Sequence, residues 1–390
     1  MPDHVKNYRI TLETLTPVFI GAGEHHVLSP YSDYVEEDRH VLILDPKKME
    51  DALAEQPDLI DEYVIGIRKN MDNTRSTFEL SSFIRNRLKQ APVELASARL
   101  PIRGGSLGKN QIRRHIADAG RPYIPGSSIK GAVRTAVLFK WLDSKAGAST
   151  RNDLLQLVRQ KRWQELKRFS VQERCFGKIS HDLFRFVRIS DTHPGQPDNL
   201  EIAEIKRVFV RPPKGRGCKG GKTSIPQWSE VIPAGIRFTF HLSLVSTTPP
   251  NETFSFLETG DAQTLFNAIN DFSFASVARE AEIMEQFQHN RLQSIYDFYD
   301  TLYERLEKPG GKQAFLRLGG GKTYFDQSIG LVFDTEKHES DLLELLKLLR
   351  VGRNIQKLNT LSEFPKTRSF VFENGTPRYP LGWVKLTFSS

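Results

Sequence analysis

Two cations four residues apart open the segment that is best suited to bind a charged ligand. The segment YIPGSSIKGAVRTAVLFKWL covers residues 123–142 and places Lys130 and Arg134 in the first turns of a predicted helix. Cations lose stability there because the amino end of a helix carries a partial positive charge. An anion docked on the free backbone N–H groups would reverse that effect, and a phosphate is the natural candidate. The alternative is that both side chains are solvated on the outer face of the helix.

The residues around these cations indicate how the helix begins and which side it buries. Pro125 and Gly126 favour a turn, and Ser127 or Ser128 can cap the first backbone N–H groups. Apolar residues fall mostly on one face, which we expect to be core: Ile129, Val133, Ala136, Val137 and Trp141.

A second cationic segment carries seven Lys or Arg residues and no acid between Lys206 and Lys222. Its part RPPKGRGCKGGKTS, residues 211–224, is too rich in Gly and Pro for regular structure. A phosphate backbone would order such a loop and release counterions, whereas the alternative is a solvated loop without a ligand. The residues expected to contact phosphates here are Arg211, Lys214, Arg216, Lys219 and Lys222.

The stretch LRLGGGKTYFDQSIG, from Leu316, resembles the end of a nucleotide-binding P-loop but fails on spacing. The P-loop pattern requires Gly where Leu316 stands, so we do not expect an ATPase. What the pattern predicts is a glycine loop that carries a cation and lets the backbone approach a phosphate, and a tight structural turn is the alternative. The candidate RNA contacts are Gly319, Gly320, Gly321 and Lys322.

Two histidines offer the main catalytic alternative. His25 and His26 could do acid–base chemistry on an RNA 2′-hydroxyl, and Asp33 or Asp38 could hold a metal, which would make the protein an endoribonuclease. However, no metal-ligand spacing or paired-carboxylate spacing surrounds them. We therefore predict no catalytic residue, no metal and no cofactor, and we keep the endoribonuclease as the second hypothesis.

Composition favours a globular protein with a polyanionic partner. The 390 residues are 38% hydrophobic, and 55 Lys and Arg against 47 Asp and Glu give a net charge of +8. Nucleic acid is the first candidate partner and an acidic membrane surface the second. The two cysteines, Cys175 and Cys218, form no metal-binding pair, and neither a signal peptide nor a long apolar run is found, so we expect a cytoplasmic protein.

Strands and helices interleave along the chain. The expected strands cover residues 8–20, 41–45, 183–191, a stretch that ends at Val210, 237–245, 314–318, 329–333 and 382–388. The expected helices cover residues 47–59, 81–90, 123–142, 152–169, 257–308 and a stretch from Asp341. This order favours an α+β fold, for which a pair of ferredoxin-like sheets would fit. The boundary is expected at STTPPNETF, which divides the chain into residues 1–246 and 247–390.

Several of these motifs together resemble the RAMP superfamily of CRISPR proteins. They are ITLETLTPVFIGAGE, PYIPGSSIKGAVRTAVL, LFRFVRISD, LRLGGGK and FPKTRSFVFENGTPRYPLGWVKL, and they span the chain from end to end. Their order is most similar to the fifth subunits of type III-A Csm effector complexes. One departure is the glycine loop, where three consecutive glycines replace glycines that alternate with apolar residues.

The resemblance implies a RAMP-type fold of two RRM-related ferredoxin-like domains with helical and loop insertions. It implies a non-catalytic, CRISPR RNA-binding subunit that caps the backbone filament at the 3′ side of the guide and supports guide maturation and assembly in antiviral defence. The implied partners are neighbouring backbone RAMP subunits, CRISPR RNA and target RNA, with no membrane. Matched residue by residue, it puts these side chains beside the RNA: Ser127, Ser128, Lys130, Arg134, Lys366 and Arg368.

Overall fold

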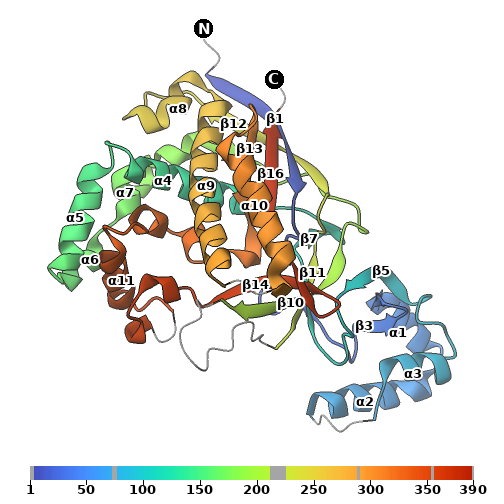
Figure 1. The fold of residues 1–390 in the computed structure, drawn as a ribbon. Helices are drawn as coiled ribbons and strands as arrows, with labels where there is room; N and C mark the ends of the chain where they lie inside the picture. The colour runs from blue at the N-terminus through green and yellow to red at the C-terminus, as the bar shows by residue number, and fades with distance from the viewer. Residues whose placement is uncertain (1–3, 73–76, 211–224, 288–289, 353–354, 389–390) are drawn as a thin grey trace.

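The computed structural model describes residues 4–72, 77–210, 225–287, 290–352 and 355–388. Helices and two main β-sheets are interleaved in one mixed α+β molecule, as the sequence predicts (Figure 1). Every helix in the described part of the chain is too short or too polar to cross a membrane.

The first sheet has the strand order β13-β16-β1-β12-β9 within the described residues, and all its neighbours are antiparallel. The strands are β1 (Val5–Thr14), β9 (Val187–Ile189), β12 (Arg237–Val245), β13 (Gln313–Arg317) and β16 (Trp383–Phe388). Ile10 in β1 lies opposite Phe240 in β12 and Phe388 in β16. Because apolar and polar residues alternate along β1 and β12, one face of these strands is buried and the other is more accessible, whereas both faces of β13 are buried.

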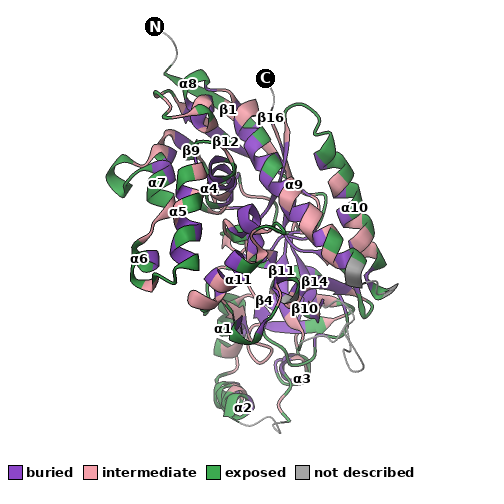
Figure 2. Cartoon of the chain, turned by 60° about the vertical axis from the view of Figure 1, so that its left-hand side comes forward, coloured by how far each residue is buried: buried purple, intermediate pink, exposed green. Residues whose placement is uncertain are grey.

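Helices cover the buried face. The helix α4 (Gly126–Asp143) contacts β9, β13 and α9 (Ala262–Phe287), and α10 (Gln293–Glu307) packs against α9. Ile129 and Val133 of α4 share one apolar core with Ile10 of β1 and Phe240 of β12. The apolar face predicted for α4 is therefore confirmed as core. Figure 2 shows buried and exposed residues alternating around α9 and α10, as expected for helices that lie on a core.

The second sheet has the order β2-β6-β11-β10-β5-β4-β3 in the described part of the chain, with β14 paired to β10 and β15. Its strands are β2 (Val27–Leu28), β3 (Tyr34–Glu37), β4 (His40–Leu44), β5 (Ala96–Arg103), β6 (Ile112–Arg113), β10 (Glu201–Phe209), β11 (Gln227–Val231), β14 (Thr367–Glu373) and β15 (Thr376–Pro380). A short hairpin, β7 (Ala117–Asp118) and β8 (Arg121–Pro122), precedes α4.

An outlying helical unit lies between β4 and β5 and has an apolar cluster of its own (Figure 1). It consists of α1 (Pro46–Ala54), α2 (Ile60–Asp72) and α3 (Leu80–Asn86). The other helices are α5 (Ala148–Arg159), α6 (Trp163–Arg168), α7 (Val171–Phe176), α8 (Ser255–Thr259) and α11 (Glu339–Leu348).

One expected strand and the first part of another have a different conformation. Residues 330–333 form a 3-10 helix, so the strand predicted at 329–333 is wrong. In the strand predicted over 183–191, residues 183–186 also form a 3-10 helix, because the Asp182 carboxylate accepts a hydrogen bond of 2.7 Å from the Phe184 N–H. Short apolar runs such as these do not by themselves distinguish a strand from another buried segment.

The division expected at Ser246 does not separate the sheets. β1 pairs with β12 before that residue and with β16 after it. β10 pairs with β14 in the same way, so both sheets join the two halves of the chain.

Candidate nucleic-acid interface

Three segments singled out in the sequence lie at one end of the first sheet. One antiparallel strand, β16, lies between β13 and β1, and another, β12, lies between β1 and β9. β1, β9 and β13 therefore run in the same direction. The turn after β1, the glycine loop after β13 and the start of α4 beside the end of β9 therefore share that end. Four strand spacings of about 4.8 Å separate β13 from β9, so the row is about 20 Å long.

The start of α4 is held by the protein itself. The helix begins at Gly126 without a side-chain cap, so neither Ser127 nor Ser128 takes the capping role expected for one of them. The N–H of Gly126 donates a hydrogen bond of 2.7 Å to the Asp191 carboxylate. Gly126 also packs so closely that a Cβ there would lie 2.5 Å from the Ile189 carbonyl oxygen. A native carboxylate thus satisfies one of the N–H groups predicted to hold a phosphate.

Arg134 also has an internal anionic partner. Its guanidinium donates to both carboxylate oxygens of Asp182, at 3.0 and 2.8 Å, and its Cζ lies 3.9 Å from the centre of the Phe176 ring. The prediction that Arg134 awaits an external phosphate is therefore corrected. The charge that looked unfavourable on this helix is balanced by Asp182 and by an aromatic ring.

For the remaining residues at the start of α4, contact with RNA stays a prediction. Ser127 is exposed, and Ser128 and Lys130 are half-buried. The Nζ of Lys130 lies 5.8 Å from the centre of the Phe184 ring, and no ion pair of Lys130 is found within the described ranges. Burial is the main cause that lowers the pKa of Lys130. The positive charges of Arg134 and Arg188 lower this pKa further, whereas the negative charge of Asp182 raises it. An added anion would offset the repulsion among these cations.

The glycine loop packs tightly on the turn that follows β1. The Gly320 N–H donates to the Phe19 carbonyl oxygen at 2.9 Å. Gly319 has φ 74°, and a Cβ there would lie 2.1 Å from the same oxygen. Gly321 packs against Leu381. The three glycines are therefore explained by packing within the protein. Gly320 is exposed, but its N–H is already bonded to Phe19, so an RNA contact of this loop stays a prediction.

A buried ion pair anchors the segment after the glycines. The carboxylate of Asp326 accepts hydrogen bonds from Arg317 at 2.9 Å and from the Thr323 N–H at 2.6 Å. Arg317 and Asp326 are almost fully buried. Lys322 is half-buried beside them, and burial lowers its pKa. This arrangement fixes where the backbone of Lys322 lies relative to the turn after β1.

Sequence reasoning missed a basic cluster in the middle of the row. Arg113 lies 5.0 Å from the centre of the Phe19 ring, and Arg114 lies 3.6 Å from the buried Glu230 carboxylate. Next to them His115 is buried, and burial lowers its pKa to about 4. Three consecutive basic residues, RRH at 113–115, were the available signal, but their neighbours Phe19 and Glu230 are distant in sequence.

The two C-terminal candidates differ in accessibility. Arg368 is 2% exposed and donates from Nε to both oxygens of the Glu280 carboxylate, at 2.9 and 2.7 Å. The prediction that Arg368 contacts RNA is therefore corrected, because its charge is already paired inside the protein. Lys366 is half-buried and stays a candidate. The five cations of the basic loop, Arg211, Lys214, Arg216, Lys219 and Lys222, lie outside the described residues.

The residues of the catalytic alternative do not form a cluster with metal-binding geometry among the described residues. His25 and His26 are exposed in the turn after Gly23. The Asp33 carboxylate accepts hydrogen bonds from the Ser29 N–H at 2.7 Å and from the Ser32 hydroxyl at 2.8 Å. Asp33 thus stabilises its own turn.

Comparison with known proteins finds relatives along nearly the whole chain. The RAMP superfamily matches residues 11–325. A "CRISPR system Cms protein Csm5" of Methanocaldococcus jannaschii is 24% identical over 406 residues, which cover 97% of this chain and 88% of that protein. The protein of the same name from Streptococcus thermophilus is 29% identical over 223 residues, covering 52% of this chain and 56% of that protein.

Solved structures match the fold over nearly the whole chain. A chain in the cryo-EM structure of a Csm-crRNA-target RNA ternary complex of a type III-A CRISPR-Cas system has a TM-score of 0.67 at 21% identity, covering 98% of this chain and 100% of that one. The crystal structure of T. onnurineus Csm5 has a TM-score of 0.64 at 21% identity, covering 96% and 99%.

Proposed function

Because this chain belongs to the RAMP superfamily, we propose that it is a Csm5-type subunit of a type III-A effector complex that grips CRISPR RNA by its backbone. The observation that carries the proposal is the row of close-packed backbone turns and cations at one end of the first sheet, in a chain whose full-length curated relative is a Csm5 protein. The cations of this row, such as Lys130 and Lys322, offer positive charge to phosphates without reading bases.

The strand order supports the RRM-related part of the proposal. β1, α4, β9, β12, α9 and β16 occur in this order along the chain, with other elements between them, as in a ferredoxin-like β-α-β-β-α-β unit. β16 pairs antiparallel with β1, as the last strand of such a unit does, and β13 is added at the edge beside β16. Helices α4 and α9 lie on one face of that unit. A second unit of the same kind stays a prediction.

Protein partners are part of the same proposal, and α2 offers a surface for one. Four apolar side chains of this outlying helix are exposed by 41 to 74%: Ile60, Val64, Ile65 and Met71. Exposed apolar residues gathered on one helix are typical of a protein contact. We assign this surface to a neighbouring subunit of the complex. The capping position at the 3′ side of the guide and the support of guide maturation belong to the proposal as well.

The test uses the full chain purified with a tag from its native cells, followed by sequencing of the RNA that copurifies. Short repeat-derived guides are the expected result, and their absence from a preparation that contains other Csm subunits would contradict the proposal. A salt titration of the purified chain with labelled single-stranded RNA supplies the number of phosphates contacted. Cleavage of that RNA, lost in a His25→Ala, His26→Ala variant, would favour the endoribonuclease instead.

A further inference from the structure

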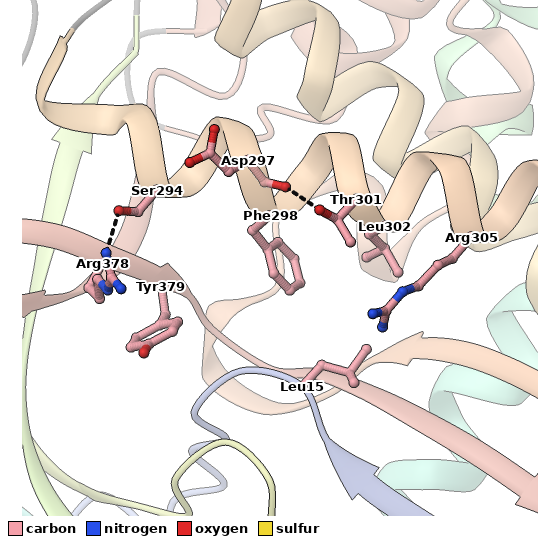
Figure 3. Close-up of a pocket in the computed structure, with 9 residues that line it drawn as sticks. All are labelled: Leu15, Ser294, Asp297, Phe298, Thr301, Leu302, Arg305, Arg378 and Tyr379. Atoms are coloured by element: carbon pink, nitrogen blue, oxygen red, sulfur yellow. Dashed lines mark hydrogen bonds between the residues drawn. The ribbon is translucent and has the colours of Figure 1, made fainter.

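A pocket of about 380 Å³ opens between α10 and β15 (Figure 3). Phe298, Leu302 and Arg305 of α10 line it on one side, and Arg378 and Tyr379 of β15 on the other. Its volume falls within the range of about 300–1,000 Å³ that is typical of small-ligand sites. No role for this pocket follows from the motifs of the sequence.

The pocket carries excess positive charge. Arg305 and Arg378 are exposed, and Arg378 donates a hydrogen bond of 2.8 Å to the Ser294 hydroxyl. No ion pair of Arg305 is found in the part of the chain that the structure describes. The one carboxylate of the lining, Asp297, accepts a hydrogen bond of 2.8 Å from Gln293, and in Figure 3 it points away from the pocket. Two guanidinium groups are thus available for an anion.

Aromatic rings stand beside these guanidinium groups. Phe298 and Tyr379 are both half-buried, so part of each ring remains accessible. Arg378 lies 5.8 Å from the centre of the Tyr379 ring. Arginines next to accessible rings are what an unpaired nucleotide needs, since its base stacks on a ring while its phosphate binds a guanidinium group.

The pocket adjoins the candidate RNA interface. Leu15, another lining residue, directly follows β1 and begins the turn that contains Gly21 and Gly23. Tyr379 packs against the small apolar cluster that contains Phe19 and Leu381. Phe19 accepts the hydrogen bond of Gly320, and Leu381 contacts Gly321. A strand of RNA that follows the row at the end of the first sheet would therefore reach this pocket next.

We propose that the pocket binds one unpaired nucleotide of the bound RNA, with its base against Phe298 and Tyr379 and its phosphate at Arg305 and Arg378. This inference rests on the proposed function. It adds a site that binds a base, next to the row at the end of the first sheet, which is proposed to bind only the RNA backbone. The site distinguishes no base sequence, because every base presents a face that can stack.

Variants of the full chain test the proposal by their affinity for labelled single-stranded RNA. Tyr379→Ala should weaken binding about tenfold, and Tyr379→Phe should retain the affinity because the ring remains. Arg305→Ala should reduce the slope of log affinity against log salt by about 0.7. Arg68→Ala, which removes an exposed arginine from the distant helix α2, is the matched control and should change neither. Unchanged affinity and slope in folded Tyr379→Ala and Arg305→Ala proteins would overturn the proposal.

Crosslinking of the wild-type chain to RNA that contains 4-thiouridine gives a second measurement, which needs no substitution in the protein. Crosslinks to Phe298 or Tyr379 are the expected result. Bound RNA with crosslinks only elsewhere would overturn the nucleotide pocket and leave the proposed function standing. Absence of any RNA binding by the wild-type chain, alone or in the assembled complex, would overturn both.

Discussion

Arg134 on α4 and Asp182 before β9 form a two-point ion pair, with N–O distances of 3.0 and 2.8 Å. The same guanidinium stacks on Phe176, which is fully buried. Arg134 thus joins α4 to the segment that leads into the edge strand of the first sheet. Its partner supplies the negative charge that the sequence alone suggested would come from RNA.

Arg134→Ala should therefore destabilise the protein. We expect a loss of about 1–2 kcal/mol in the free energy of unfolding, because a charged hydrogen-bonded pair and a cation–π contact disappear together. Urea unfolding monitored by circular dichroism measures this loss. An unchanged urea midpoint would contradict the structural role and return Arg134 to the RNA interface.

Lys130→Ala should behave in the opposite way. Lys130 has no carboxylate partner among the described residues, so we expect an unchanged urea midpoint, weaker RNA binding and a salt slope reduced by about 0.7. A salt titration with single-stranded RNA measures the slope. A slope equal to that of the wild-type protein would remove Lys130 from the interface. The double variant Lys130→Ala, Arg134→Ala should lose stability through Arg134.

Gly319→Ala should destabilise the glycine loop by about 2–3 kcal/mol. Its φ of 74° is unfavourable for a side chain, and the new Cβ would lie 2.1 Å from the Phe19 carbonyl oxygen. Gly311→Ala is the matched control, because nothing lies within 4 Å of a Cβ there. Thermal unfolding of both variants measures the difference. Equal midpoints would mean that the loop does not need the close contact with Phe19.

Arg368→Ala should cost about 3–5 kcal/mol, because it leaves the Glu280 carboxylate buried without its partner. Replacing both residues with apolar ones, as in Arg368→Met with Glu280→Leu, should recover part of that loss. Lys366→Ala, two residues away, should leave stability within about 0.5 kcal/mol of the wild type. An Arg368→Ala protein of normal stability and weaker RNA binding would contradict the internal role.

His115 should make stability depend on pH between about 4 and 6.5. Burial lowers its folded-state pKa to about 4, whereas the unfolded chain binds the proton near 6.5. The stability gained by burying neutral His115 is therefore complete above pH 6.5. As the pH falls toward 4 this stability is lost, and the free energy of unfolding decreases by up to about 3 kcal/mol. His115→Asn should flatten this part of the profile in urea unfolding at several pH values. The same slope in both proteins would show that other groups cause it.

The sequence predicted the fold class, the family and several elements correctly. The strand at 237–245 has the predicted bounds, since clear alternation of apolar and polar residues determines it. The resemblance to RAMP proteins is confirmed by the match over residues 11–325. The partners of Arg134 and Arg368 could not be predicted, because Asp182 and Glu280 lie 48 and 88 residues away in the chain. Without them, a buried or paired cation cannot be distinguished from a free one.

The hairpin of β14 and β15 has a clear signal in the sequence. Asn374 and Gly375, with φ of 49° and 77°, connect its strands. An Asn-Gly pair between apolar runs is a strong signal for a two-residue hairpin turn. That hairpin carries Arg378 and Tyr379, so the same signal indicates the strand that lines the pocket beneath α10.

The pairing of β1 with both β12 and β16 has a consequence for biosynthesis. A ribosome makes β1 long before β13, and β16 after both, so β16 must insert between β13 and β1 to complete the sheet. Until then two strand edges stay unpaired. A nascent chain therefore cannot offer a finished surface to its partners, and translation that stops early should yield a product that aggregates or is degraded rather than one that enters an assembly.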